Sequence, residues 1–333
     1  MSDSISPSVV TAETRSGQWL PVIDVTNPRF AVADDPESLR RLLDASAKEE
    51  RSRRYLPRFL LRLMIKSLGK RSLLARALFN TDSTFLGGLS TYVLKLGADN
   101  LPPPYDGPVD RKFAASAQLT LLRLRTQQTA RLLADGLAEI LEAGGAPLHL
   151  INIAGGPAID SLNALLILRQ SHPDLLRRRI VINVLDQDAD GPFFGANALN
   201  ALKADDRSLA GVDVTFVHHS YNWNDTSALT RLLRESAQTG AVVAASSEGG
   251  LFEYGGDDAV VANLGALHAG GVRLVVGSVT VNTKARRRSI AISGFKLIPR
   301  GLEGFAPLAE RSGFRIARSL PIHFSDQVQL RPL

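Results

Sequence analysis

The residues best suited to bind a ligand lie in a turn of small side chains, Ala154–Ala158, between an apolar run and a helix-like segment. The run Leu148–Ile153 has the composition of a buried strand, and the following segment begins at Asp160. Side chains this small let a ligand touch the backbone, and the free N–H groups of the next helix then face that ligand. Because similar turns also occur in units that bind nothing, the rest of the chain has to support a ligand site here.

A carboxylate, Asp186, ends the next apolar run, 180–185, and Gln187 follows it. Ligands of parallel sheets bind beyond the carboxyl ends of the strands, where an acidic side chain can accept hydrogen bonds from ribose hydroxyls. We therefore expect Asp186 to bind a ribose and Gln187 to contact the ribose or an adenine edge. The alternative is that Asp186 caps the next helix, for which Asp188 or Asp190 is better placed.

Two aromatic and two small polar residues, Ser220–Trp223, follow the third apolar run. Rings and polar groups at one rim are suited to holding a purine by stacking and hydrogen bonding. We expect Ser220, Tyr221 and Asn222 to contribute to this site. The preceding His218 and His219 would point to opposite faces of a strand, so the pair cannot bind one metal ion there.

The fourth apolar run leads into Ser246, Glu248 and two glycines. A carboxylate at the end of a strand could act as a base or bind a substrate amine. The alternative is a helix cap or a charge that faces solvent, and Glu253 fits the catalytic interpretation less well than Glu248. Ser246 is expected on the ligand side of this loop.

Apolar runs alternate with helix-like segments from residue 147 onward, which predicts an α/β fold with a parallel sheet covered on both faces. The expected strands are 149–153, 180–185, 212–217, 241–245 and 273–279. The expected helices are 160–171, 193–204, 225–238 and 257–269. A helix over 301–312 and a hairpin of 314–322 with 327–330 complete the expected sheet domain.

The first part of the chain has a different character. Residues 1–35 lack periodicity and are expected to form a flexible arm, whereas 36–146 have the apolar spacing of helices throughout. We therefore predict an all-helical domain over 36–146 and a nucleotide-binding domain over 147–333.

Composition narrows the function classes. The 333 residues include no cysteine and six histidines, which excludes disulfides and thiolate metal sites and leads us to expect no metal. The chain has no apolar run long enough to span a bilayer and no apolar signal segment, so we expect a soluble, cytoplasmic protein without membrane association. A formal net charge of +6 permits an anionic partner. Basic segments at 51–71 and 284–288 keep open a different function class, a nucleic-acid or membrane-surface binder, although no dedicated nucleic-acid module is found.

In combination these motifs resemble the class I S-adenosylmethionine (SAM) dependent methyltransferases. The sequence of 152–158, Asn-Ile-Ala-Gly-Gly-Pro-Ala, is similar to the D-V-G-G-G-P-G motif of the family's small-molecule enzymes, and Asp186 matches its ribose-binding acid. The paired glycines in 268–276 and the final hairpin resemble the family's fifth strand and antiparallel seventh strand. The resemblance covers 147–332. It implies a Rossmann-like sheet, parallel with one antiparallel strand, under an N-terminal helical lid.

The resemblance also implies SAM as the bound cofactor, with no metal. The cofactor contacts that it implies come from the first motif: Asn152, Ala154, Gly155, Gly156 and Pro157. The chain departs from the family where Asn152 replaces the acid and where Ala154 and Ala158 replace glycines. These changes cost backbone freedom at the turn and alter how the methionine amino group would be held.

The catalytic candidates are Tyr92 in the helical part, Tyr221 and Glu248. Further polar residues of the lid are candidates for the substrate side: Lys95, Gln118, Arg123 and Gln127. The family resemblance implies methyl transfer to a small natural-product-type acceptor, and a homodimer is possible. A weaker resemblance to azetidine-2-carboxylate synthases leaves open a second reaction, cyclisation of SAM with release of methylthioadenosine. A closed aromatic pocket without space for an acceptor would favour that reaction.

Overall fold

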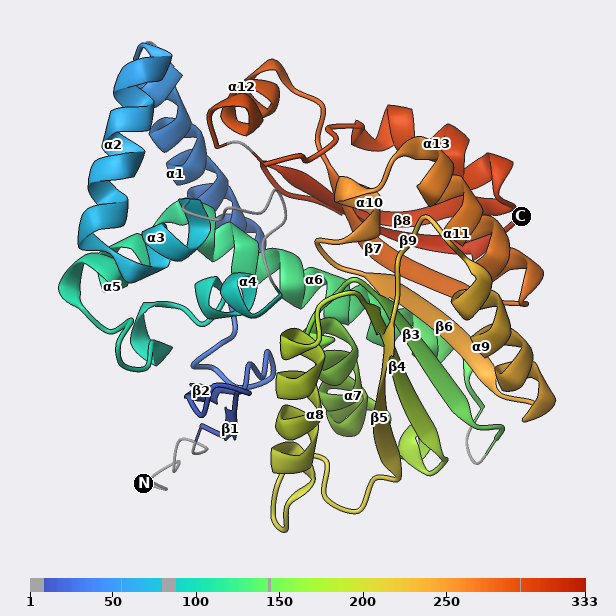
Figure 1. Cartoon of the computed structure of the whole chain (residues 1–333). Helices are drawn as coiled ribbons and strands as arrows, with labels where there is room; N and C mark the ends of the chain where they lie inside the picture. Colours follow the sequence, from blue (N-terminus) through green and yellow to red (C-terminus); the bar gives the residue numbers. More distant parts are fainter. Residues whose placement is uncertain (1–8, 55, 80–87, 143–144, 294) are drawn as a thin grey trace.

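A seven-stranded sheet forms the centre of the computed structural model, which describes residues 9–54, 56–79, 88–142, 145–293 and 295–333 (Figure 1). Its strands are β3 (Leu148–Ile153), β4 (Ile180–Asp186), β5 (Val214–Ser220), β6 (Val242–Ser247), β7 (Leu274–Thr280), β8 (Phe314–Pro321) and β9 (Ser325–Pro332). They lie in the order β5-β4-β3-β6-β7-β9-β8, and β9 runs antiparallel to both of its neighbours. The predicted fold class, a parallel sheet with one antiparallel strand, is confirmed.

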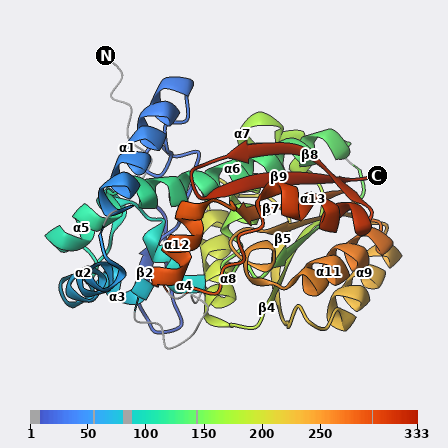
Figure 2. The same cartoon turned by 90° about the horizontal axis from the view of Figure 1, so that it is seen from above.

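Helices cover both faces of this sheet because alternate side chains of its strands enter two different apolar cores. In β7, Leu274 and Val276 belong to one core and Val275 to the other. The helices α6 (Ala117–Ile140), α7 (Ile159–Ser171) and α8 (Asp190–Lys203) cover the first face. The second face is covered by α9 (Ser227–Gln238), α10 (Leu251–Tyr254), α11 (Asp257–Ala269) and α13 (Gly301–Arg311). Figure 2 shows the sheet between these two layers.

The remaining helices lie to one side of the sheet, as Figure 1 shows. They are α1 (Pro36–Arg54), α2 (Arg58–Arg71), α3 (Leu73–Phe79), α4 (Gly88–Leu94), α5 (Pro108–Ala114) and α12 (Lys284–Ser293). Two 3-10 turns, Ala98–Asn100 and Pro173–Leu176, complete the described helical elements. The helix α6 joins the two parts, because it contacts α1 and α5 and also packs on α7, β7 and β9. The last helix before the sheet, α6, ends at Ile140, and the first strand of the sheet, β3, begins at Leu148.

The expectation of a flexible arm over 1–35 is wrong for residues 9–35, and residues 1–8 lie outside the described part. Strands β1 (Thr11–Glu13) and β2 (Trp19–Pro21) form a hairpin against α8, and Leu20 is fully buried. The backbone beyond β2 is held by side chains: Asn163 of α7 accepts from the N–H of Val25 at 2.7 Å and donates to the carbonyl of Ile23. Short segments fixed by such long-range contacts leave no periodic signal in the sequence.

Among the described helices, none combines the length and apolarity that crossing a bilayer would need.

Candidate active site

The turn between β3 and α7 adopts a strained backbone. Ala154 and Ala158 have φ values of +55° and +52°, a left-handed conformation that side chains other than glycine rarely adopt. Gly156 has φ +56°, and Gly155 leaves no room for a side chain, since a Cβ there would lie 2.1 Å from Oδ1 of Asn152. The two alanines therefore keep the backbone path that glycines would allow, at a cost in strain.

Asn152 lies beneath this turn and is fully buried. Its Nδ2 donates to Oδ1 of Asp160 at 2.7 Å and to Oγ of Ser246 at 3.0 Å. Burial, followed by the nearby Glu248 carboxylate, raises the pKa of Asp160. Asn152 and Ser246, which the sequence placed in the cofactor site, thus form a buried polar layer that supports the turn, and neither lines the cavity above it.

Asp186 ties the turn to the end of β4. Its Oδ2 accepts a hydrogen bond from the N–H of Gly156 and its Oδ1 from that of Asp188, both at 2.9 Å. Burial raises the pKa of Asp186 despite these two bonds. A carboxylate has about four acceptor positions, so Asp186 can accept further hydrogen bonds from a ligand.

A cavity of about 520 Å³ opens above the turn and is walled by both parts of the chain. The residues predicted from sequence that line it are Ala154, Gly155, Gly156, Pro157, Asp186, Gln187, Tyr221, Asn222, Glu248, Tyr92 and Lys95. Trp223 also contributes to its wall. Ser220 is exposed and does not line it, because β5 runs on to Ser220 and the cavity wall begins with the next residue, Tyr221.

A buried ionic cluster stands on the opposite wall of this cavity. Nε of Arg125, from α6, donates to Oε1 of Glu248 at 2.6 Å, and Nζ of Lys95 donates to the other oxygen of the same carboxylate. Nη1 of Arg125 also donates to Glu253 at 3.1 Å. Burial alone would raise the pKa of Glu248, but Arg125 and Lys95 outweigh burial and lower the pKa to about 2. The cluster joins the helical part to the loop after β6.

The two predicted tyrosines have hydroxyl groups that are already bonded within the protein. The hydroxyl of Tyr92 donates to the carbonyl of Pro21 at 2.7 Å and accepts from the N–H of Ile23 at 2.8 Å. That of Tyr221 donates to Oδ1 of Asn263 at 2.5 Å. Burial raises the pKa of both phenols. Their rings line the cavity, while their hydroxyl groups hold neighbouring segments in place.

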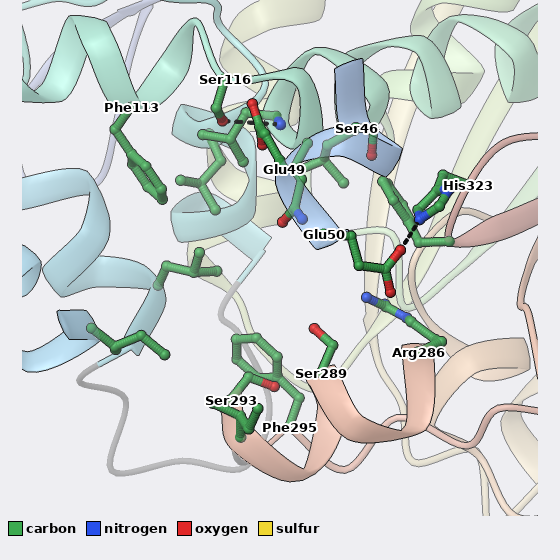
Figure 3. A pocket seen from close by; sticks show the side chains of 18 of the residues that line it. Ser46, Glu49, Glu50, Phe113, Ser116, Arg286, Ser289, Ser293, Phe295 and His323 are labelled. Atoms are coloured by element: carbon green, nitrogen blue, oxygen red, sulfur yellow. Dashed lines mark hydrogen bonds and ion pairs between the residues drawn. The ribbon is translucent and has the colours of Figure 1, made fainter. Parts of the chain in front are cut away.

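A second, larger cavity of about 1620 Å³ adjoins the first (Figure 3). Four residues line both cavities: Thr91, Arg125, Gly249 and Tyr254. Its walls come from α1, α2, α5, α6 and α12, and Figure 3 shows Phe113 and Phe295 on different sides of the space. Burial, followed by Glu253, raises the pKa of Tyr254 to about 12. A phenol that stays protonated therefore lies where the cavities meet.

Of the four substrate-side candidates of the lid, two line a cavity and two bind a neighbouring backbone segment. Lys95 lines the smaller cavity and Gln118 the larger one. Gln127 instead bonds both backbone groups of Val32, and Arg123 donates to the carbonyl of Phe30 at 2.9 Å. Both of these hold the segment before α1.

Arg125 is the main functional candidate that sequence reasoning missed. A signal for it exists: Leu121, four residues earlier, and Leu132, seven residues later, are both fully buried, so helical spacing puts Arg125 on the same face. A charged residue on a buried helix face needs a partner. The identity of that partner, a carboxylate 123 residues away, has no local signal in the sequence.

No group of side chains suited to hold a metal ion is found among the residues that the structure describes.

Three features match the pattern of the class I methyltransferases. They are the sheet order with its antiparallel β9, the glycine turn after β3 and the acid Asp186 at the end of β4. The chain has the class I methyltransferase fold. No family model matches the sequence, and no curated protein matches it.

Among solved structures, the chain is similar to a possible exported protein from Bordetella parapertussis, with 16% identity and a TM-score of 0.54 over 90% of this chain and 99% of that one. It is also similar to the pyocyanin biosynthetic protein PhzM, at 15% identity and a TM-score of 0.40 over 65% of this chain and 58% of that one. The chain thus matches less than two thirds of PhzM. The third similarity is to CalO1, a methyltransferase in calicheamicin biosynthesis, at 16% identity and a TM-score of 0.38 over 77% and 71% of the two chains. Similarity at such identities concerns the fold alone.

Proposed function

We propose that this protein is a SAM-dependent methyltransferase that methylates a small molecule bound in the larger cavity. The observation that supports it best is the meeting of the two cavities at Arg125, Gly249 and Tyr254. The smaller cavity contains the glycine turn and Asp186, and the larger one is mostly apolar. A donor in the first and an acceptor in the second would be neighbours.

The smaller cavity fits SAM in size and in chemistry. Its volume of about 520 Å³ lies within the range of small-molecule sites, about 300–1,000 Å³. Asp186 would accept from the ribose hydroxyls with its remaining acceptor positions, and Gln187, Asn222 and Trp223 surround the place for the adenine. On the opposite wall Lys95 and Arg125 offer positive charge to the methionine carboxylate.

When bound, SAM would supply a methyl group that its sulfonium has already activated. The protein then has to align the acceptor and exclude water, and alignment alone can lower a barrier by about 7–11 kcal/mol. Glu248, expected from sequence to be a base, has a pKa of about 2 and two cationic partners. It is therefore too weak a base at neutral pH and instead positions Arg125 and Lys95. Tyr254, with a pKa of about 12, stays protonated at the junction.

The alternative reaction, cyclisation of SAM, is not favoured by the cavities. The sequence-based criterion for it was a closed pocket without space for an acceptor, whereas a cavity of about 1620 Å³ adjoins the donor site. Incubation of the protein with SAM alone separates the two reactions. Release of methylthioadenosine without any acceptor would support cyclisation and contradict our proposal.

Several residues of the basic segments that suggested a nucleic-acid or membrane-surface binder lie at the larger cavity. Arg51, Arg71, Lys284 and Arg288 all line the larger cavity. We therefore assign them to the surroundings of a small-molecule substrate. The homodimer stays a prediction, which light scattering on the purified protein would test.

Calorimetric titration with SAM tests the proposed function. We expect the wild type to bind SAM and Asp186→Asn to bind it about 10- to 100-fold more weakly, the loss typical of a hydrogen bond to a charged group. Asp205→Asn removes the same charge from an exposed position outside the cavity and should leave the affinity unchanged. Failure of the folded wild type to bind SAM, or equal affinity of both variants, would contradict the proposal.

A further inference from the structure

Arg286 of α12 is a desolvated cation without an anionic partner among the described residues. Its Nε is buried and makes no hydrogen bond to them, and no carboxylate of theirs lies within ion-pair distance of its guanidinium. Burial lowers the pKa of Arg286. The guanidinium lies over the ring of Phe324, with its carbon 5.3 Å from the ring centroid. Figure 3 shows this side chain reaching from α12 into the larger cavity.

The acids around Arg286 are engaged elsewhere. Glu253 binds Arg125, and Glu50 binds His323. Electrostatically, Glu253 is the stronger of the two attractions on Arg286, and Arg125 opposes them. Around the junction lie the cations Lys95, Arg125 and Arg286 and the buried carboxylates Glu248 and Glu253. The partly exposed Glu50 attracts the half-buried Arg286 more weakly than Glu253 does.

Among the described residues, Arg286 thus has no carboxylate within ion-pair distance. Burying a charge without a partner costs far more than burying a neutral group, unless a ligand supplies the opposite charge. The whole larger cavity has the same bias: its described lining includes seven Lys and Arg side chains and three Glu. The Arg286 guanidinium lies close enough to Arg125, which lines both cavities, for the charge of Arg125 to act on it.

Much of the remaining cavity wall is apolar, which favours a ligand whose anionic group is attached to an apolar body. Large apolar side chains come from several elements: Leu61, Ile65, Leu119, Phe113, Phe295 and Phe324. A volume of about 1620 Å³ exceeds the usual range for small ligands, about 300–1,000 Å³. A large apolar body with one anionic group would fill such a space and compensate the charge of Arg286.

We propose that the methyl acceptor is a bulky apolar carboxylic acid whose carboxylate binds Arg286 beside the junction of the two cavities. This inference rests on the proposed function, since it names the substrate class of the same site. The guanidinium would hold the acid by charge-assisted hydrogen bonds. The apolar body would extend along the wall formed by α2, α5 and α12.

Binding of 2-naphthoic acid and dodecanoic acid, each compared with its methyl ester, tests this inference without any turnover. We expect the wild type to bind the acids more tightly than the esters. Arg286→Gln should bind the acids about 10- to 100-fold more weakly, because a charged hydrogen bond is lost, and should bind the esters as before. Arg286→Lys should retain part of the preference.

The matched control is Arg287→Gln. Arg287 is adjacent in sequence and exposed, bonds Asn282, and does not line the cavity, so its loss should change no affinity. Equal binding of acids and esters by the wild type, or an equal effect of the two substitutions, would overturn the inference. SAM affinity is measured in parallel. If SAM binds and the acids are not preferred, the inference fails alone, whereas an Arg286-dependent preference for acids without SAM binding would contradict the proposed function alone.

Discussion

Arg125 binds Glu248 with an Nε–Oε1 distance of 2.6 Å, and this pair connects the helical part to the sheet where the two cavities meet. Both side chains are almost fully buried. Because Lys95 binds the second oxygen of the same carboxylate, loss of Glu248 would leave the buried Lys95 without its partner and Arg125 with Glu253 alone. The pair therefore fixes the shape of the site as well as the packing of the lid.

Glu248→Gln is expected to lower the free energy of unfolding by about 3–5 kcal/mol, the usual effect of breaking a buried ion pair. Urea denaturation measures this loss. Glu139→Gln, which removes a half-exposed partner of Arg331, is the control and should cost at most about 1 kcal/mol. Similar losses in both variants would contradict the structural role assigned to Glu248.

The stability of Asp160→Asn should depend on pH. The folded-state pKa of Asp160 is raised above its ordinary value of 3.8. The wild type therefore loses stability as pH rises from about 4 through the folded-state pKa, because the buried acid must either keep its proton or ionise at a cost. The variant lacks this loss, so its stability relative to the wild type should increase over that interval. Denaturation curves between pH 4 and pH 8 that stay parallel would contradict this assignment.

The strained alanines of the turn give a matched pair of substitutions. The left-handed conformation costs an L-residue about 1–2 kcal/mol, and glycine in place of alanine costs about 0.5–1 kcal/mol of chain entropy. Ala154→Gly should therefore stabilise the protein by up to about 1 kcal/mol. Ala158→Gly should be close to neutral, because Ala158 is fully buried and its methyl group contributes about 0.8 kcal/mol of burial. Destabilisation of the protein by Ala154→Gly in urea would show that the turn is not strained at that residue.

Gly155→Ala should destabilise the protein by about 1–3 kcal/mol or more, because the new Cβ would lie 2.1 Å from Oδ1 of Asn152. Gly265→Ala is the comparison: Gly265 lies within α11, a Cβ there meets no atom within 4 Å, and alanine is the better helix former by about 0.8–1.0 kcal/mol. The two variants should thus shift the urea midpoint in opposite directions. A shift in the same direction would contradict the geometry of the turn.

The parts of the site that could be predicted from sequence are those fixed by local chemistry at strand ends. The turn 154–158 and Asp186 follow apolar strands directly, so their place at one edge of the sheet follows from the order of elements. Asn152 and Ser246 were expected in the cavity, but whether a side chain points above or below a turn depends on neighbours such as Asp160.

Other features depend on contacts between distant parts of the chain. The hydroxyl of Tyr92 holds a segment about 70 residues earlier, and that segment has no periodic pattern of its own. The ionic cluster likewise depends on α6 and the loop after β6 meeting across the cavity. Helical spacing in one sequence can indicate a buried charge such as Arg125, whereas its distant partner Glu248 has no local signal.

A crystal structure with S-adenosylhomocysteine, the demethylated product of SAM, tests the central claim most directly. We expect its ribose on Asp186, its adenine beside Asn222 and Trp223, and its sulfur directed to the junction at Arg125 and Tyr254, where the larger cavity begins. A ligand bound elsewhere, or with its sulfur directed away from that cavity, would contradict the account.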